Sequence, residues 1–111
     1  MKIRQYDIYM ANLSPAKGTE PGKTRPVVVV QTNLLNEGHP STIICPVTTN
    51  IKPEIDILRV HLTEKETEIA SDILVDQLRA IDNRRLLNKI GTLTKEQQLK
   101  LRQNIKIILD V

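Results

Sequence analysis

The strongest hydrophobic signal along this chain is the run Val27-Val28-Val29-Val30. Four β-branched residues in sequence predict a buried strand, placed here over residues 25–31, with both of its faces covered. The ten residues 17–26 hold two glycines and two prolines, which excludes a helix interior and indicates a loop. The loop therefore delivers Arg25 to the first residues of a stiff strand.

Other strands are predicted where short apolar segments alternate or are bounded by turn residues. These segments are residues 6–13, 42–47 and 55–62. Pro46, near the end of the third predicted strand, indicates an edge or a bulge because proline has no N–H. Residues 33–41 read as a loop with room for a helical turn, and residues 63–70 as a loop or short helix.

Residues 71–82 fit two periodicities. Ile73, Leu74, Leu78 and Ile81 have helical spacing, whereas an alternation of two faces also fits a strand. Periodicity alone slightly favours the helix. Residues 83–86 resemble a turn, and Gly91-Thr92 breaks the chain again.

A helix is predicted over residues 95–109. Thr94 and Gln97 form a capping box at its start, and four apolar residues line one face. These residues are Leu101, Ile105, Ile108 and Leu109. Several short strands and one C-terminal helix predict a mainly β (α+β) protein, with a strongly bent sheet or barrel and one domain over residues 1–111.

Charge and aromatic content indicate which kinds of ligand the chain could bind. The net charge is +3, and residues 1–52 hold six Lys/Arg against three acids, so the excess lies in the half that carries the loop. This is compatible with a polyanionic ligand. Tyr6 and Tyr9 are the two aromatic residues, so a nucleic acid would be bound mostly through phosphates and base edges.

The sequence shows no sign of a membrane span, a signal peptide, a reactive cysteine or a metal site. No segment approaches the roughly 18 apolar residues of a membrane span, and the N-terminus lacks a signal peptide, so a cytoplasmic protein is expected. Cys45 lies in an apolar run and reads as a buried, inert thiol. His39 and His61 show no metal-ligand spacing, and a two-histidine pair for RNA cleavage is disfavoured. No metal or cofactor is expected.

Polar residues at predicted strand ends are the remaining candidates for chemistry. Arg25 and Thr48 could meet if the second and third strands pair, and a guanidinium beside a hydroxyl suits a phosphate. The residues alone leave Arg25 equally open to being a solvated strand-end charge. For Asp76, Gln77 and Arg79, they favour a structural network of hydrogen bonds and salt bridges.

Five motifs, in order and at similar intervals, resemble the MazF/PemK family of toxin endoribonucleases over nearly the whole chain. They are Asp7-Ile8-Tyr9, Lys17-Gly18-Thr19-Glu20, Thr24-Arg25-Pro26-Val27-Val28-Val29, Pro46-Val47-Thr48, and Asp76-Gln77-Leu78-Arg79-Ala80-Ile81-Asp82 with Arg84-Arg85-Leu86. The final amphipathic helix adds to the resemblance.

The resemblance implies an SH3-like plasmid-maintenance-toxin β-barrel with a C-terminal helix, a homodimer, and a strand over residues 71–82. It implies cleavage of single-stranded RNA at short sequences without metal. It also implies inhibition by a cognate MazE-like antitoxin with a disordered, acidic tail. Catalytic roles carry over to Arg25 and Thr48, and Glu20 is placed at the active site. RNA contacts are expected from Lys17, Thr19, Lys23, Thr49, Asp76, Gln77 and Arg79.

The chain departs from the family at three positions. Thr19 stands where some relatives have histidine, Leu74 where some have arginine, and Tyr9 where tryptophan is common. The first two weaken an aspartate-centred mechanism and favour Arg25 and Thr48. An alternative is a toxin of the same fold that binds DNA gyrase and cuts nothing, but the intact Arg25 and Thr48 motifs argue against it.

Overall fold

The computed structural model describes residues 2–14, 18–19 and 22–111. The strands are β1 (Asp7–Asn12), β2 (Thr24–Val29), β3 (Ser41–Thr48), β4 (Arg59–Leu62), β5 (Ser71–Leu74), β6 (Arg79–Asp82) and β7 (Leu86–Thr92). The α-helices are α1 (Asn33–Asn36), α2 (Glu64–Thr67) and α3 (Lys95–Leu109), and single 3-10 turns are η1 (Asp56–Leu58), η2 (Val75–Gln77) and η3 (Asn83–Arg85).

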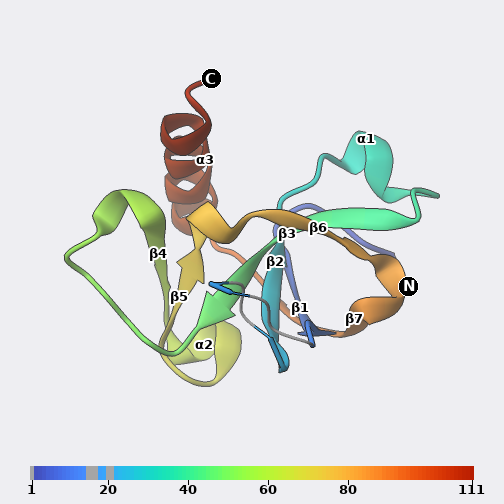
Figure 1. The fold of residues 1–111 in the computed structure, drawn as a ribbon, viewed down its shortest axis with the longest axis horizontal. Coiled ribbons are helices and arrows are strands. Elements are labelled where there is room, and N and C mark those ends of the chain that lie inside the picture. The colour runs from blue at the N-terminus through green and yellow to red at the C-terminus, as the bar shows by residue number, and fades with distance from the viewer. Residues whose placement is uncertain (1, 15–17, 20–21) are drawn as a thin grey trace.

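The strands form one antiparallel, curled sheet in the order β4-β5-β3-β2-β1-β7, and β6 pairs with the first half of β3. The long C-terminal helix α3 stands beside the end of the sheet that carries β4, and it contacts β4, η1 and η2 (Figure 1). Within the described ranges β4 and β7 do not pair, so the sheet is curled without closing. The predicted fold class, mainly β with a C-terminal helix, is confirmed.

The valine run lies at the centre of this sheet, as predicted. β2 pairs with β1 on one side and with β3 on the other. Val28 packs in one core cluster with Ile8 and Leu101, whereas Val27 and Val29 pack in a second cluster with Tyr9. Both faces of β2 are therefore covered, which is why the run is continuous rather than alternating.

The predicted helix α3 is confirmed together with its capping box, in which the Thr94 and Gln97 side chains each accept from the other's backbone N–H. Leu101 is fully buried, and Ile105 and Ile108 pack partly buried against the same cluster. Leu109, which was predicted on this face, is 53% exposed, although Ile108 beside it packs against the cluster.

The helix favoured by periodicity over residues 71–82 is wrong. The segment forms two strands, β5 and β6, joined by the 3-10 turn η2. Ile73 and Val75 are fully buried, and Ile81 is nearly so. The helical spacing is a coincidence of two short strands separated by a turn, of which β5 buries three consecutive residues and β6 buries Ile81.

Two other segments differ from prediction. The first half of segment 55–62 is the turn η1 rather than strand, and residues 86–92, which were not predicted as a strand, form β7. β7 is an outer strand that pairs with β1, and only Leu86 of it is buried. It carries little hydrophobic alternation for that reason, so its sequence gave no strand signal.

Of the two placements predicted for Pro46, an edge strand or a bulge, the edge strand is wrong. β3 is central and pairs with β2 through Pro46 itself. On its other side β3 pairs with β6 up to Ile44 and with β5 from Val47 onward. Pro46 lies where the partner changes, so the missing N–H interrupts neither of these two ladders.

Candidate functional site

Arg25 lies in the second position of β2 and is half-buried. Its Nε donates to the carbonyl oxygen of Gly22 at 3.0 Å, and its Nη1 lies 3.4 Å from the carbonyl oxygen of Val47. The β2–β3 register pairs Val27 with Pro46, and continuing it by two residues places Arg25 opposite Thr48. The strand register and the contact of Arg25 with Val47 thus bring Arg25 close to Thr48, in agreement with the pairing of the second and third strands on which the sequence prediction depended.

Arg25 and Thr48 line one cleft of about 370 Å³. Its described lining comes from two parts of the chain: β1, β2 and the end of β3 contribute one group of residues, and the segment from the end of α2 to the start of β5 contributes the other. The described lining residues are Met10, Thr24, Arg25, Pro26, Val47, Thr48, Thr49, Thr67, Glu68, Ile69 and Ser71. A guanidinium and several hydroxyls in one open cleft suit an anionic, hydrogen-bonding ligand such as a phosphodiester.

Thr48 is the last residue of β3 and is half-exposed. Its Oγ1 accepts a hydrogen bond of 3.1 Å from the backbone N–H of Asn50. Because a hydroxyl has one proton to donate and this contact uses a lone pair, the Thr48 O–H stays available to donate to a ligand. Thr49, predicted to contact RNA, is exposed at the rim of the same cleft.

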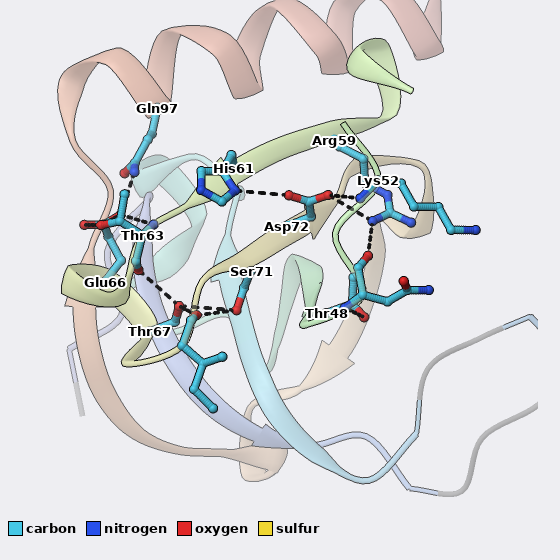
Figure 2. Close-up of polar contacts among 12 residues, drawn as sticks. Thr48, Lys52, Arg59, His61, Thr63, Glu66, Thr67, Ser71, Asp72 and Gln97 are labelled. Atoms are coloured by element: carbon cyan, nitrogen blue, oxygen red, sulfur yellow. Dashed lines mark hydrogen bonds and ion pairs between the residues drawn. The ribbon is translucent and has the colours of Figure 1, made fainter. Parts of the chain in front are cut away.

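Short hydrogen bonds stabilise the part of the cleft lining that lies between α2 and β5. The hydroxyls of Thr67 and Ser71 both donate to the carbonyl oxygen of Ile69, at 2.7 and 2.6 Å. Glu66, one residue before this turn, accepts from Thr63 and from Gln97 of α3 (Figure 2). This part of the cleft lining is thereby tied to the C-terminal helix.

The Glu66 contacts predict a pH dependence of stability. Burial alone raises the pKa of Glu66, but hydrogen bonds from Gln97 and Thr63 outweigh it and the pKa is lowered. A lowered folded-state pKa gives stability that is present above the unfolded value of about 4.3 and is lost as the pH falls through the folded value. In urea unfolding, we expect the stability advantage of wild type over Glu66→Gln to be constant from pH 7 to about pH 5 and to shrink by pH 3.

The matched control is Glu64→Gln, which removes an exposed carboxylate from the same helix α2. No comparable pH-dependent difference from wild type is expected for it. An advantage of wild type over Glu66→Gln that stays the same down to pH 3 would contradict the interpretation.

Glu68 is a cleft residue that the sequence did not single out. It caps the C-terminus of α2 in a left-handed conformation, with φ of 69°, and its side chain is exposed. Among the described lining residues, Glu68 and Arg25 are the two that carry charge. In sequence it is one of several glutamates in a polar stretch, so only the position of the turn identifies it.

The remaining predicted residues lie apart from this cleft or outside the described residues. Lys17 and Glu20 belong to the second group. Thr19 lies in a turn, and Lys23 has a positive φ of 65° with its N–H donating to Ser14; both are exposed. Asp76, Gln77 and Arg79 follow β5, and Arg79 pairs with Ile44, four residues before Thr48. None of these three lines the cleft. A role for these residues in RNA binding stays a prediction.

The cysteine and histidine predictions hold. Cys45 is fully buried, and burial together with the nearby charge of Asp76 raises the pKa of its thiol to about 12, which keeps it inert. His39 is a loop residue bonded to Ser41, and the side chain of His61 is 56% exposed. In the part of the chain that the structure describes, no three His, Cys, Asp or Glu residues gather in a group that could hold a metal ion.

The curled sheet with one C-terminal helix, and the cleft lined by Arg25 and Thr48, define a small β-fold protein with a candidate site for an anionic ligand. Residues 4–109 match the family described as PemK-like, MazF-like toxin of type II toxin–antitoxin system. The curated Endoribonuclease MazF of Staphylococcus epidermidis is 32% identical over 109 residues, covering 96% of this chain and 91% of that protein.

Solved structures agree in fold. MazF from Deinococcus radiodurans superposes with a TM-score of 0.87 at 20% identity, covering 100% of this chain and 99% of that chain. The MazE–MazF structure (Form-III) from the same organism gives 0.82 at 19% identity, covering 100% and 99%. The chain belongs to the PemK-like, MazF-like family of type II toxins and is a toxin endoribonuclease of that family. Among the described helices, none is long and apolar enough to cross a membrane.

Proposed function

We propose that this protein is a sequence-specific, metal-independent endoribonuclease that cleaves single-stranded RNA and inhibits translation and growth as the toxin of a toxin–antitoxin pair. The observation that carries the proposal is the contact of Arg25 with the Val47 carbonyl, which holds the guanidinium next to Thr48 in one cleft. Two donors of different shape then converge on a space open to a phosphodiester.

RNA cleavage by the ribose 2′-oxygen requires few catalytic groups from the protein. The ribose 2′-oxygen attacks the adjacent phosphorus, the O2′–P bond forms and the P–O5′ bond breaks. The 2′-hydroxyl loses its proton, the departing 5′-oxygen takes one up, and the products are a 2′,3′-cyclic phosphate and a 5′-hydroxyl end. The nucleophile belongs to the substrate, so no metal-bound hydroxide is required. Negative charge grows on the non-bridging oxygens, where the guanidinium of Arg25 and the hydroxyl of Thr48 would stabilise it.

A carboxylate is the preferred acceptor for the 2′-hydroxyl proton, because the pKa of arginine stays above about 12. Glu20 is the candidate from the sequence, and it lies outside the described residues. Glu68, which lines the same cleft as Arg25 and Thr48, is a second candidate. Substituting each by Gln separately would assign the role.

The remaining sequence predictions are part of the same proposal. Lys17, Thr19, Lys23, Thr49, Asp76, Gln77 and Arg79 would bind RNA and set the cleavage motif. The protein would act in the cytoplasm as a homodimer, and a MazE-like antitoxin with an acidic tail would occupy the RNA site. The MazE–MazF structures from Deinococcus radiodurans, which share the fold of this chain, support the partnership. The net charge of +3 suits an acidic ligand.

The testing experiment incubates the protein with a long single-stranded RNA in EDTA and maps fragment ends by primer extension. Discrete cuts with 5′-hydroxyl ends support the proposal and give the cleavage motif. No cleavage of several unrelated RNAs would overturn it and direct attention to a protein target such as DNA gyrase.

Thr48 provides a test of its hydroxyl. We expect Thr48→Val, which keeps the shape and removes the O–H, to lower the single-turnover cleavage rate about 10²-fold. Thr48→Ser retains a hydroxyl and is the matched control, with a rate within about tenfold of wild type. A Val variant that cleaves as fast as the Ser variant would remove Thr48 from the mechanism.

A further inference from the structure

A buried carboxylate lies directly behind Thr48. Asp72 of β5 pairs with Thr48 across the β3–β5 ladder, and its side chain is only 3% exposed. Its Oδ2 accepts from the backbone N–H of Lys52 at 2.9 Å and from Nη1 of Arg59 at 3.1 Å. Isolated burial of a charge is unfavourable, so a carboxylate in this place needs such partners. Asp72 thus ties the segment that follows Thr48 to the sheet.

Arg59 extends the connection. Its side chain is 11% exposed, and the same Nη1 that contacts Asp72 donates to the carbonyl oxygen of Asn50 at 2.8 Å (Figure 2). The backbone of Arg59 is fixed from the other side, since buried Asn104 of α3 donates to its carbonyl oxygen at 3.1 Å. The guanidinium is therefore a rigid bridge between β5 and the peptide of Asn50.

Asn50 completes a path to the cleft. Its N–H donates to Oγ1 of Thr48 at 3.1 Å. This contact occupies one lone pair of the Thr48 oxygen and thereby selects the direction in which the hydroxyl proton is presented. Hydrogen bonds run from Asp72 through Arg59 to the carbonyl oxygen of Asn50. The N–H of the same residue, on the other side of its Cα, bonds to the hydroxyl proposed to meet the phosphate.

We propose that Asp72 and Arg59 are positioning residues, which orient the Thr48 hydroxyl through the backbone of Asn50 without touching the RNA. This inference rests on the proposed function of Thr48. Displacing a reactive group by about 1 Å costs up to about 10²-fold in rate. The loss falls on kcat, because the contact of Thr48 with the phosphate strengthens as charge develops, whereas ground-state RNA binding depends on many other groups.

The test is a double-mutant cycle on cleavage. Arg59→Gln, in a background with Thr48 intact, is expected to lower kcat by about 10- to 10²-fold with KM within about twofold. In a Thr48→Val background, the same change is expected to alter kcat by less than about twofold, since the hydroxyl to be oriented is gone. Equal losses in the two backgrounds, or no loss in either, would overturn the proposal.

Asp72→Asn is the second variant, because it keeps an oxygen for the Lys52 N–H and is less disruptive than removal of the arginine. The matched control is Lys100→Gln, which breaks the ion pair between α3 and Asp56 of the neighbouring turn η1 and leaves the Thr48 path intact. Kinetics unchanged from wild type are expected for Lys100→Gln. A loss of kcat as large as that of Arg59→Gln would indicate a general structural effect and overturn the proposal.

Amide hydrogen exchange supplies a readout that does not need cleavage. In Arg59→Gln, exchange at Asn50 and Lys52 is expected to become faster while buried amides of β2 stay protected. Faster exchange at Asn50 with an unchanged kcat would overturn the positioning role and leave the proposed function standing. A wild-type protein that cleaves no RNA, by contrast, would remove the proposed function itself and the inference with it.

Discussion

Replacing Arg25 by alanine is expected to abolish most RNA cleavage, lowering the single-turnover rate about 10³-fold. The guanidinium is the one described cation that lines the cleft, and its contacts with Gly22 and Val47 fix it there before substrate arrives. Prearranged charge stabilises a developing phosphorane dianion without reorganisation during the reaction, so its loss raises the barrier directly.

Arg25→Lys separates charge from shape. A lysine keeps the positive charge but has one nitrogen, which cannot reproduce the separate Nε and Nη1 contacts that aim the arginine. We expect its rate to fall between those of wild type and Arg25→Ala. Arg102→Ala, which removes an exposed arginine of α3, is the control and should cleave like wild type. An Arg25→Ala rate within about tenfold of wild type would exclude Arg25 as the main source of transition-state stabilisation.

The second large effect concerns stability. Leu101→Ala is expected to lower the free energy of unfolding by about 2–5 kcal/mol, because Leu101 is fully buried where α3 meets the sheet. The substitution removes transfer free energy and leaves a cavity among Ile8, Leu62 and Ile73, which belong to the same core cluster. A fall in Tm of about 10 °C or more follows for a chain of this length.

Leu99→Ala is the matched control, since it makes the same chemical change two residues earlier on α3, where the side chain is 59% exposed. A change of less than about 0.5 kcal/mol is expected. Urea unfolding should be compared at one protein concentration, because self-association would make stability concentration-dependent. Equal destabilisation by the two variants would show that α3 does not bury Leu101 as the structure has it.

The sequence predicted a helix or strand correctly where the residues that define it lie close together in the chain. The capping box of Thr94 and Gln97 is formed by residues three apart, so it could be recognised before any tertiary contact was known. The valine run carried its own burial signal. β7 had none, because its position beside β1 leaves most of its side chains exposed.

Residues 71–82 are a segment whose secondary structure could not be predicted from local periodicity. Their apolar spacing satisfied a helix and a strand about equally, and the decision came from pairing with β4 and with two different halves of β3. The family resemblance favoured extended structure here, whereas periodicity did not. Long-range hydrogen bonding overrode a local preference that was weak to begin with.

The amino-acid sequence by itself determined the mainly β class, the C-terminal helix and its cap, the buried thiol, and Arg25 and Thr48 as the principal candidates. These follow from local propensity and from short motifs. The tertiary structure decided that Glu68 and Arg25 line one cleft and that Arg59 joins Asp72 to the carbonyl oxygen of Asn50 beside Thr48. Antiparallel pairing brings together side chains that are far apart in the chain, and no local pattern encodes which polar residues will meet.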